Sequence, residues 1–414
     1  MVQDKKTPLI PKDKWLLSPS LCFLNHGSFG ACPIEILNVQ RNFQDRLERS
    51  PVAFFIREAN DLLHQSRAWL AQFLNCDTEG LVFIRNASEG VSTALRSLDL
   101  SYEDEVLCLD HIYPACRHML SAIRQKTGVG IREIPTDEYV RSPVECINQM
   151  LQTTTRQVQA VIIDHITSAS AFSLDHQLSF VISNLREQGI KTIIDGAHAP
   201  GQLMLNINEL APDYYIGNLH KWLFAPKGTA FLWINTDMRR QVKPQTISHG
   251  FLNRTNQLHA LFDWVGTQDM SAWFTLPMIG HWLNQNGGIQ SINQYNQNLC
   301  TQAYSLIAQA LNELSSDHAA LPLIPPVWSA PNMVAIPLSS TLLNKLNTII
   351  VPKGQKAPSL SKDIHPLQNA LFDRNIEVPI TEVHGTKYLR ISAQAYNHIG
   401  EYAQLADELQ ELFS

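Results

Sequence analysis

The sequence predicts an α/β protein built around a mainly parallel sheet. Between residues 81 and 235, short apolar runs rich in β-branched residues alternate with stretches of helical periodicity. Because parallel strands need long crossover connections, this alternation favours a sheet covered by helices on both faces. The runs are LVFI (81–84), EVLCL (105–109), AVIIDHI (160–166), KTIID (191–195), YYIGN (214–218) and TAFLWI (229–234).

Two helices are predicted before the first of these strands. Apolar residues recur at helical spacing from about residue 34 to residue 75, and the pair Ser50-Pro51 interrupts them. Proline lacks the backbone N–H that a continuing helix needs, so a turn between two helices is expected there.

A smaller domain is predicted from about residue 286. The sequence Asn286-Gly287-Gly288 marks a break, after which an amphipathic helix begins near Tyr295. The segment KYLRISAQAY (387–396) alternates like a half-buried strand, with Leu389 and Ile391 on one face and Arg390 on the other. A last helix is expected over residues 402–412.

Composition excludes several classes of protein. The 414 residues are 44% hydrophobic and 17% charged, which is typical of a packed globular chain, and the net charge is −6 without a basic run that would bind nucleic acid. No stretch approaches the roughly 18 apolar residues of a membrane helix, and the start lacks a signal-like apolar segment, so we expect a soluble, cytoplasmic protein. Seven scattered cysteines without a CxxC pair favour reduced thiols over disulfides or a zinc site.

The segment GNLHKWLFAPKG (217–228) places Lys221 at a strand end in a turn-rich, partly apolar setting. Burial lowers the pKa of a lysine, which makes its amine a nucleophile for an aldehyde. Taken alone, a lysine is more often a solvated surface charge.

Asp195 directly follows the apolar run before GAHA. A carboxylate at a strand end can keep a pyridinium nitrogen protonated, as an electron-withdrawing cofactor ring requires. Capping of the next helix is the plainer interpretation of the same residue.

Two further motifs end neighbouring strands. RNASEG (85–90) begins a helix with small residues, which suits a phosphate, although it also reads as an ordinary capping box. In the segment DHIY (110–113), either His111 or Tyr113 offers a flat ring that can stack on a cofactor, or simply an aromatic residue packed in a loop.

The order and spacing of these motifs resemble the class V aminotransferases, a family of pyridoxal 5′-phosphate (PLP) enzymes, and most closely their isopenicillin N epimerase-like branch. The resemblance implies the aspartate aminotransferase-like PLP-dependent transferase fold, with an N-terminal segment (1–30) near the active site, a large PLP-binding domain (31–285) and a small α+β domain (286–414). The motifs that carry it are FLNHGSFGACP, RNASEGV, DHIY, DHITS, IIDGAHAPGQ, GNLHKWLFAPKG, WVGTQD and LRISAQAYN.

The resemblance also assigns roles to single residues. Lys221 would form the Schiff base, Asp195 would pair with the pyridinium nitrogen, and His198 would lie near the phenolic oxygen of the ring. Ser168 and one of His111 and Tyr113 would contact the cofactor as well. The phosphate would be held by Ala87, Ser88 and Glu89, joined by Asn218, where related desulfurases usually have serine, and by His220.

Substrate and subunit contacts follow from the same resemblance. Arg390 would grip the α-carboxylate of an amino acid with its two parallel donors, and Asn25 and His26 would lie over the substrate. Gly266 and Thr267 would reach the phosphate of a neighbouring subunit, which implies a homodimer with shared active sites. Gln268 stands where the branch often has a basic residue, so its substrate-side contacts differ.

Several reactions at the α-carbon are open to such a site. The sequence favours epimerisation or transamination, with C–S lysis as the alternative. Cysteine desulfuration is disfavoured because that chemistry uses a thiolate in the C-terminal part, and no cysteine follows Cys300.

Two other classes of function compete with this one. One is a PLP-binding protein that has lost catalysis. The other is a metal hydrolase using histidines at strand ends, but their spacing matches no zinc pattern such as HExxH, and we expect no metal. These histidines are His111, His165, His198 and His220. The stretch from Leu343 to Asp363 is interpreted as a solvated loop or as a flap over the site.

Overall fold

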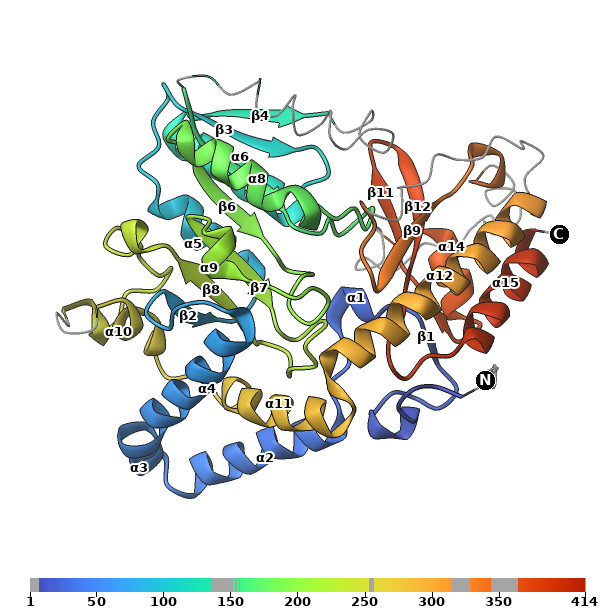
Figure 1. The fold of residues 1–414 in the computed structure, drawn as a ribbon, viewed down its shortest axis with the longest axis horizontal. Helices are drawn as coiled ribbons and strands as arrows, with labels where there is room; N and C mark the ends of the chain where they lie inside the picture. Colours follow the sequence, from blue (N-terminus) through green and yellow to red (C-terminus); the bar gives the residue numbers. More distant parts are fainter. Residues whose placement is uncertain are drawn as a thin grey trace, which may run out of the picture.

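The structure is a computed structural model that describes residues 7–135, 157–252, 257–314, 328–343 and 364–413, together with residues 152 and 155. Within these ranges the helices carry the labels of Figure 1. They are α1 (His26–Phe29), α2 (Ile34–Arg49), α3 (Pro51–Ala53), α4 (Ala59–Leu74), α5 (Ala87–Ser97), α6 (Pro114–Thr127), α8 (Asp175–Glu187), α9 (Ile207–Leu210), α10 (Gln257–Asp263), α11 (Leu276–Gln285), α12 (Gly288–Leu314), α14 (Pro366–Phe372) and α15 (Ile399–Phe413).

The described residues form a seven-stranded sheet in the order β2-β8-β7-β6-β5-β3-β4. Strand β8 runs antiparallel to both of its neighbours, and the other adjacent pairs are parallel. The predicted mainly parallel sheet is therefore confirmed, with an edge strand, β4, that the apolar runs of the sequence did not indicate. The strands are β2 (Leu81–Ile84), β3 (Glu105–Leu109), β4 (Gly130–Ile134), β5 (Val158–Asp164), β6 (Lys191–Asp195), β7 (Tyr214–Asn218) and β8 (Ala230–Ile234).

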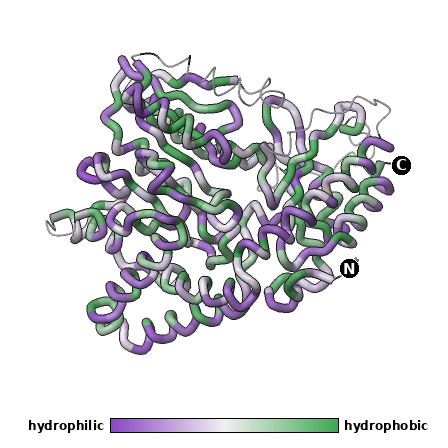
Figure 2. Tube along the Cα trace, viewed as in Figure 1, coloured by the Kyte–Doolittle hydropathy of each residue, from purple (hydrophilic) through white to green (hydrophobic). Residues whose placement is uncertain are grey.

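Both faces of this sheet are covered by helices. In β5, Val161 and Ile163 belong to one apolar cluster, which includes residues of α4, α8 and α11. Ala160 and Ile162 point to the other face and join a cluster with α5 and α6. Side chains alternate across a strand, so a run that is apolar throughout is buried on both sides. Figure 2 shows the hydrophobic residues concentrated along these central strands.

The predicted break at Ser50-Pro51 is confirmed, because α2 ends at Arg49 and Pro51 begins α3. The chain then makes a π-helical turn over Phe54–Glu58 before α4 continues. The turn brings Phe54 into the apolar core.

The C-terminal part contains a three-stranded antiparallel sheet in the order β11-β12-β9, packed with the long helix α12 and with α15. Its strands are β9 (Met333–Pro337), β11 (Ile380–Val383) and β12 (Thr386–Ser392). The alternation in β12 is confirmed, but the expected half-burial is wrong at the end of the strand. Arg390 and Ser392 are buried as completely as Leu389 and Ile391, because their face closes on the N-terminal segment and the large sheet.

The start of the chain is joined to the C-terminal part. Strand β1 (Cys22–Phe23) pairs in parallel with β10 (Ile376–Glu377), and Cys22 and Leu24 lie in the apolar cluster of the C-terminal sheet. In Figure 1 this segment runs between the two parts of the molecule, with α1 between them. The division of the chain at residues 30 and 285 stays a prediction, and the stretch after Leu343 up to Asp363 lies outside the described residues. In the ranges that the structure describes, no helix is both long and apolar enough to cross a bilayer.

Candidate active site

A cavity of about 160 Å³ opens where the parallel strands of the large sheet end. Asp164 ends β5, Asp195 ends β6 and Asn218 ends β7, so the fold delivers polar side chains from three adjacent strands to one place. This is the edge at which open α/β sheets bind their ligands. The residues around the cavity are Ser28, Phe29, Asn86, Ala87, Ser88, Tyr113, Asp164, Ile166, Ser168, Asp195, Ala197, His198, Asn218, His220 and Lys221.

Lys221 is buried, and its Nζ lies 2.9 Å from Nε2 of His198. Burial, and next the charge of Arg390, lower the pKa of Lys221 to about 7. A substantial fraction of the amine is therefore uncharged near neutral pH, which is the form that attacks a carbonyl carbon or accepts a proton. The sequence predicts a turn-rich, partly apolar setting for this lysine, and the structure adds that its side chain is buried.

The N-terminal segment holds the backbone of this lysine in place. His26 donates from Nε2 to the carbonyl oxygen of Lys221 over 2.9 Å, and its Nδ1 accepts from the hydroxyl of Tyr396 over 2.8 Å. Gly30 has φ +70°, and a Cβ on it would lie 2.0 Å from the carbonyl oxygen of His220. The structure thus places His26 behind the lysine and outside the cavity, where both ring nitrogens are occupied, in contrast to the expected substrate contact.

Two carboxyl groups lie side by side at this strand edge, since Asp164 and Asp195 are paired in the register of β5 and β6. Asp195 accepts from the backbone N–H of Ala197 over 3.0 Å and from the thiol of Cys116 over 3.5 Å. Burial raises the pKa of both carboxyls, and for Asp164 the neighbouring charge of Asp195 adds to the effect. Asp195 is therefore the member of the pair that ionises first, as a partner of a cationic ring nitrogen must.

The N-terminus of α5 forms another wall of the cavity. The backbone N–H of Ala87 donates to Oδ1 of Asn218 over 2.9 Å, which ties the helix to the end of β7. Ala87 and Ser88 face the cavity, whereas the side chain of Glu89 pairs with Arg85 and lies outside it. Helix α5 has eleven residues and begins at the cavity. Its N-terminus therefore offers backbone N–H groups and the positive end of the helix dipole to an anion.

His220 and Tyr113 line the cavity too, whereas His111 does not. His220 donates from Nδ1 to the carbonyl oxygen of Thr229 over 3.2 Å, which leaves Nε2 for the cavity. His111 is bonded through Nδ1 to the hydroxyl of Ser170 over 2.8 Å. Of the two aromatic candidates for stacking, the structure therefore places Tyr113 in the wall.

Arg390 lies directly behind the wall made by Ser28 and Ser168. Its Nη2 donates to the hydroxyl of Ser28 over 2.8 Å and to Oδ1 of Asn25 over 3.3 Å, and Nη1 donates to the backbone oxygen of Ser168 over 2.5 Å. All these acceptors are neutral, the Nε atom has no hydrogen-bond partner, and no carboxylate forms an ion pair with Arg390 among the described residues. A buried guanidinium without a counterion is a site for an anion from outside.

Gly266 and Thr267 do not line the cavity of a single chain. Sequence reasoning missed Asp164, Asn86, Ser28 and Phe29. Asp164 carried a usable signal, because it follows an apolar strand just as Asp195 does. Phe29 carried none, since its position depends on the fold of the N-terminal segment.

The residues present suit PLP on three counts. A buried nucleophilic amine matches an aldehyde, a carboxylate beside it matches a ring nitrogen, and a helix N-terminus matches a phosphate. In addition, Oδ2 of Asp164 has no hydrogen-bond partner in the part of the chain that the structure describes, so this wall can offer a polar atom to a ligand.

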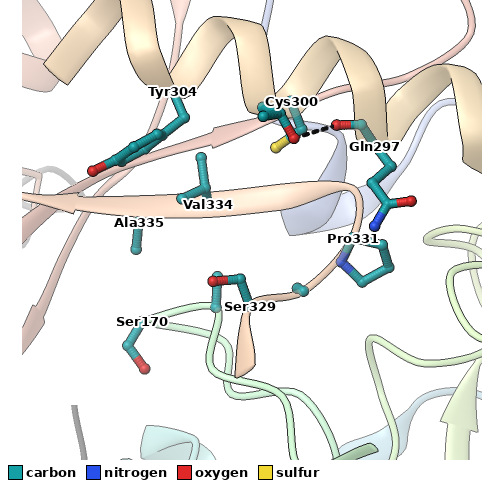
Figure 3. A pocket seen from close by; sticks show the side chains of 11 residues that line it. Ser170, Gln297, Cys300, Tyr304, Ser329, Pro331, Val334 and Ala335 are labelled. Atoms are coloured by element: carbon teal, nitrogen blue, oxygen red, sulfur yellow. Dashed lines mark hydrogen bonds between the residues drawn. The ribbon is translucent and has the colours of Figure 1, made fainter. Parts of the chain in front are cut away.

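A second cavity, of about 190 Å³, lies between α12 and β9 (Figure 3). Cys300, Gln297 and Tyr304 reach it from α12, and Ser170 reaches it from the loop after β5. It is separate from the candidate active site, although Ser170 also bonds His111.

Comparison with known proteins identifies the family to which this chain belongs. Residues 45–398 match the family model described as Aminotransferase class-V, so the chain belongs to the class V aminotransferase family, whose cofactor is PLP. The family inferred from the sequence motifs is thereby confirmed.

Individual relatives cover nearly all of the chain. A putative L-cysteine desulfhydrase 1 of Oryza sativa subsp. japonica is 27% identical over 94% of this chain and 82% of its own length. An isopenicillin N epimerase of Streptomyces clavuligerus is 26% identical over 97% of each. Among solved structures, a C-DES mutant with glycine covalently linked to its PLP cofactor matches with a TM-score of 0.77 and 18% identity, over 97% of this chain and 99% of that one. This match confirms the predicted fold.

Proposed function

We propose that the protein is a PLP-dependent C–S lyase that acts on L-cysteine or a compact S-substituted cysteine. The observation that carries this proposal is a buried amine, Lys221, whose pKa is lowered to about 7, close to a buried guanidinium, Arg390, that has no ion-pair partner among the described residues. Such a pair supplies a base for an α-carbon and an anchor for the α-carboxylate of an amino acid.

Each group of the cofactor has a matching partner in the cavity. Lys221 would hold its aldehyde carbon, Asp195 its ring nitrogen, and Ser88 with the N-terminus of α5 its phosphate. Tyr113 would cover the ring, and His198 would face its phenolic oxygen. When bound, PLP supplies an electron sink that stabilises negative charge at the α-carbon of an attached amino acid.

The chain's own residues would then carry out two tasks. Arg390 would orient the substrate through its carboxylate, and the amine of Lys221 would take the α-proton. With cysteine, loss of that proton and departure of hydrosulfide from the β-carbon leave aminoacrylate, which reacts with water to give pyruvate and ammonia. The step needs one base and no thiol of the protein, which suits a chain with no cysteine after Cys300.

The relatives favour this reaction over epimerisation of a bulky peptide. Four plant relatives are described as L-cysteine desulfhydrases, established or putative, and they cover at least 94% of the chain.

Epimerisation is a second candidate because Tyr113 also lines the cavity. Burial raises the pKa of its hydroxyl, so the group carries a proton at neutral pH and can donate it. Racemisation requires a proton donor on the face of the α-carbon opposite the base. We keep this reaction as the alternative for a small amino acid.

One incubation separates the two reactions. L-cysteine is given to the PLP-loaded protein in D₂O, and sulfide, pyruvate and α-deuterated cysteine of each hand are measured. We expect equal amounts of sulfide and pyruvate, none with Lys221→Ala, and a KM raised about 10- to 100-fold with Arg390→Lys, because a hydrogen bond to a charged group contributes about 1.5–3 kcal/mol. Formation of α-deuterated D-cysteine without release of sulfide would contradict C–S lysis and would support epimerisation instead.

We further propose a homodimer, supported by the exposure of a large apolar side chain at the cavity. Phe29, which lines the cavity, is 69% exposed in the single chain. Burial of such a side chain against a second copy of the chain would favour a subunit interface. The cytoplasmic location expected from the sequence stays a prediction.

A further inference from the structure

Three side chains form a continuous hydrogen-bonded row at the base of the cavity. The indole Nε1 of Trp222 lies 3.3 Å from Nδ1 of His198, and Nε2 of the same imidazole lies 2.9 Å from Nζ of Lys221. Trp222 is fully buried, and His198 is 1% exposed. Bulk solvent therefore has little access to either nitrogen of this imidazole.

The donor in the first contact is unambiguous, because an indole nitrogen only donates. Nδ1 of His198 must then be the unprotonated nitrogen. Burial lowers the pKa of His198 well below its usual range, so the ring carries a single proton. That proton lies on Nε2, the nitrogen that faces Lys221.

The tautomer in turn decides the charge on the lysine. An Nε2–H group needs an acceptor, and an ammonium group has none, whereas an uncharged amine offers one lone pair. With this tautomer, the observed contact is a hydrogen bond only when Lys221 is uncharged. The opposite tautomer would accept from an ammonium group and would stabilise the charged lysine.

We propose that Trp222 is a positioning residue that fixes the tautomer of His198, so that the imidazole directs an N–H at Lys221 and keeps its amine uncharged and nucleophilic. The role of this tautomer in preparing Lys221 to bind an aldehyde rests on the proposed function. With PLP present, the same N–H would face the phenolic oxygen of the cofactor. The tautomer itself depends only on the three side chains.

The first test is a direct measurement on the full-length protein without PLP. Nitrogen NMR of ¹⁵N-histidine-labelled protein distinguishes protonated from unprotonated ring nitrogens, and the signals that vanish in His198→Gln identify this residue. We expect the proton on Nε2 in the wild type and a mixture of both tautomers in Trp222→Phe. A proton on Nδ1 in the wild type would overturn the proposal, whatever reaction the protein catalyses.

The second test follows the reactivity of Lys221. PLP is added over a range of pH, the adduct is trapped with borohydride, and modified Lys221 is counted by mass spectrometry. We expect the midpoint of the pH profile to rise by about one pH unit in Trp222→Phe, because one hydrogen bond contributes about as much free energy as one pKa unit represents.

A matched control separates this role from packing. Trp273 is also buried, its indole nitrogen has no hydrogen-bond partner among the described residues, and it stacks on Phe83 in the core. Trp273→Phe removes the same volume without touching a histidine, so its pH profile should match the wild type. An equal shift in both variants, or no shift in Trp222→Phe, would contradict the positioning role. Failure of Lys221 to react with PLP in every protein would instead contradict the proposed function.

Discussion

At the scale of single residues, the two adjacent aspartates differ in protonation state because their surroundings differ. Asp195 is stabilised as a carboxylate by the Ala197 N–H, whereas one oxygen of Asp164 has no hydrogen-bond partner among the described residues. Ionising both of these buried carboxyls costs much more free energy than ionising one, because the two negative charges repel each other. The proton therefore resides on Asp164 while Asp195 carries the charge.

This division predicts how the stability of the PLP-free protein depends on pH. The pKa of Asp164 is raised in the folded protein, so the folded state binds a proton that the unfolded chain releases above its ordinary pKa of about 3.9. The stabilisation is complete below that value and is lost as pH rises through the folded pKa. Asp164→Asn, which cannot ionise, should therefore gain stability over the wild type as pH rises.

We expect the two proteins to melt at similar temperatures at pH 4, close to the unfolded pKa. At pH 8 we expect the variant to be the more stable, by about 1.4 kcal/mol for each pKa unit by which folding raises the pKa of Asp164. Thermal unfolding at both pH values measures this. Melting temperatures that change in parallel with pH would show that Asp164 ionises normally.

Residues that follow apolar strands were predictable, and residues brought in by the rest of the fold were not. Lys221, Asp195 and Asn218 meet at one sheet edge because parallel strands end together, a rule that applies to sequence alone. His26 was misplaced, since a histidine after an apolar run gives no hint that its ring will bond the lysine backbone. Arg390 was found through its strand position, but its burial depends on contacts with Asn25 and Ser28 that join opposite ends of the chain.

At the scale of elements, the central strands were predictable because each is a short run that is apolar on both faces. The edge strand β4 has the polar sequence GIREI and sits half-exposed, so its apolar pattern is weak. The pairing of β1 with β10 joins residues more than 350 positions apart, and two-residue strands carry no periodicity. That pairing nevertheless brings the N-terminal segment to the lysine.

The N-terminal segment should consequently be needed for cofactor binding as well as for folding. Gly30 and Gly189 both have positive φ, at +70° and +76°, but a Cβ on Gly189 meets nothing within 4 Å. Gly189→Ala should cost about 1 kcal/mol from backbone strain alone. Gly30→Ala adds a clash with the backbone of His220, so we expect a loss of at least about 3 kcal/mol and weaker PLP retention.

Thermal unfolding and the fraction of PLP retained on dialysis measure these effects in the two variants. Equal losses in both would mean that the segment can move away from Lys221 without consequence. A Gly30→Ala protein that is less stable yet retains PLP normally would limit the segment to a structural role.

At the scale of the whole molecule, the outer wall of the cavity is exposed in the single chain. The cavity is walled by Phe29, which is largely exposed, while Gly266 and Thr267 lie elsewhere. The resemblance to the family places these two residues against the phosphate of a second chain. A dimer would therefore cover the exposed side chain of Phe29 and would complete the phosphate site.

A dimer with shared sites predicts complementation between two inactive proteins. Lys221→Ala lacks the base, and Thr267→Ala should lack the phosphate contact from the partner. After mixing, refolding and reloading with PLP, random pairing makes half of the dimers mixed, and each mixed dimer has one site with both residues intact. We therefore expect about a quarter of the wild-type C–S lysis activity. Light scattering should give twice the chain mass of 46.6 kDa. A monomer by mass, or a mixture no more active than the better single variant, would contradict shared sites, and the outer wall would then have to be completed by the chain itself.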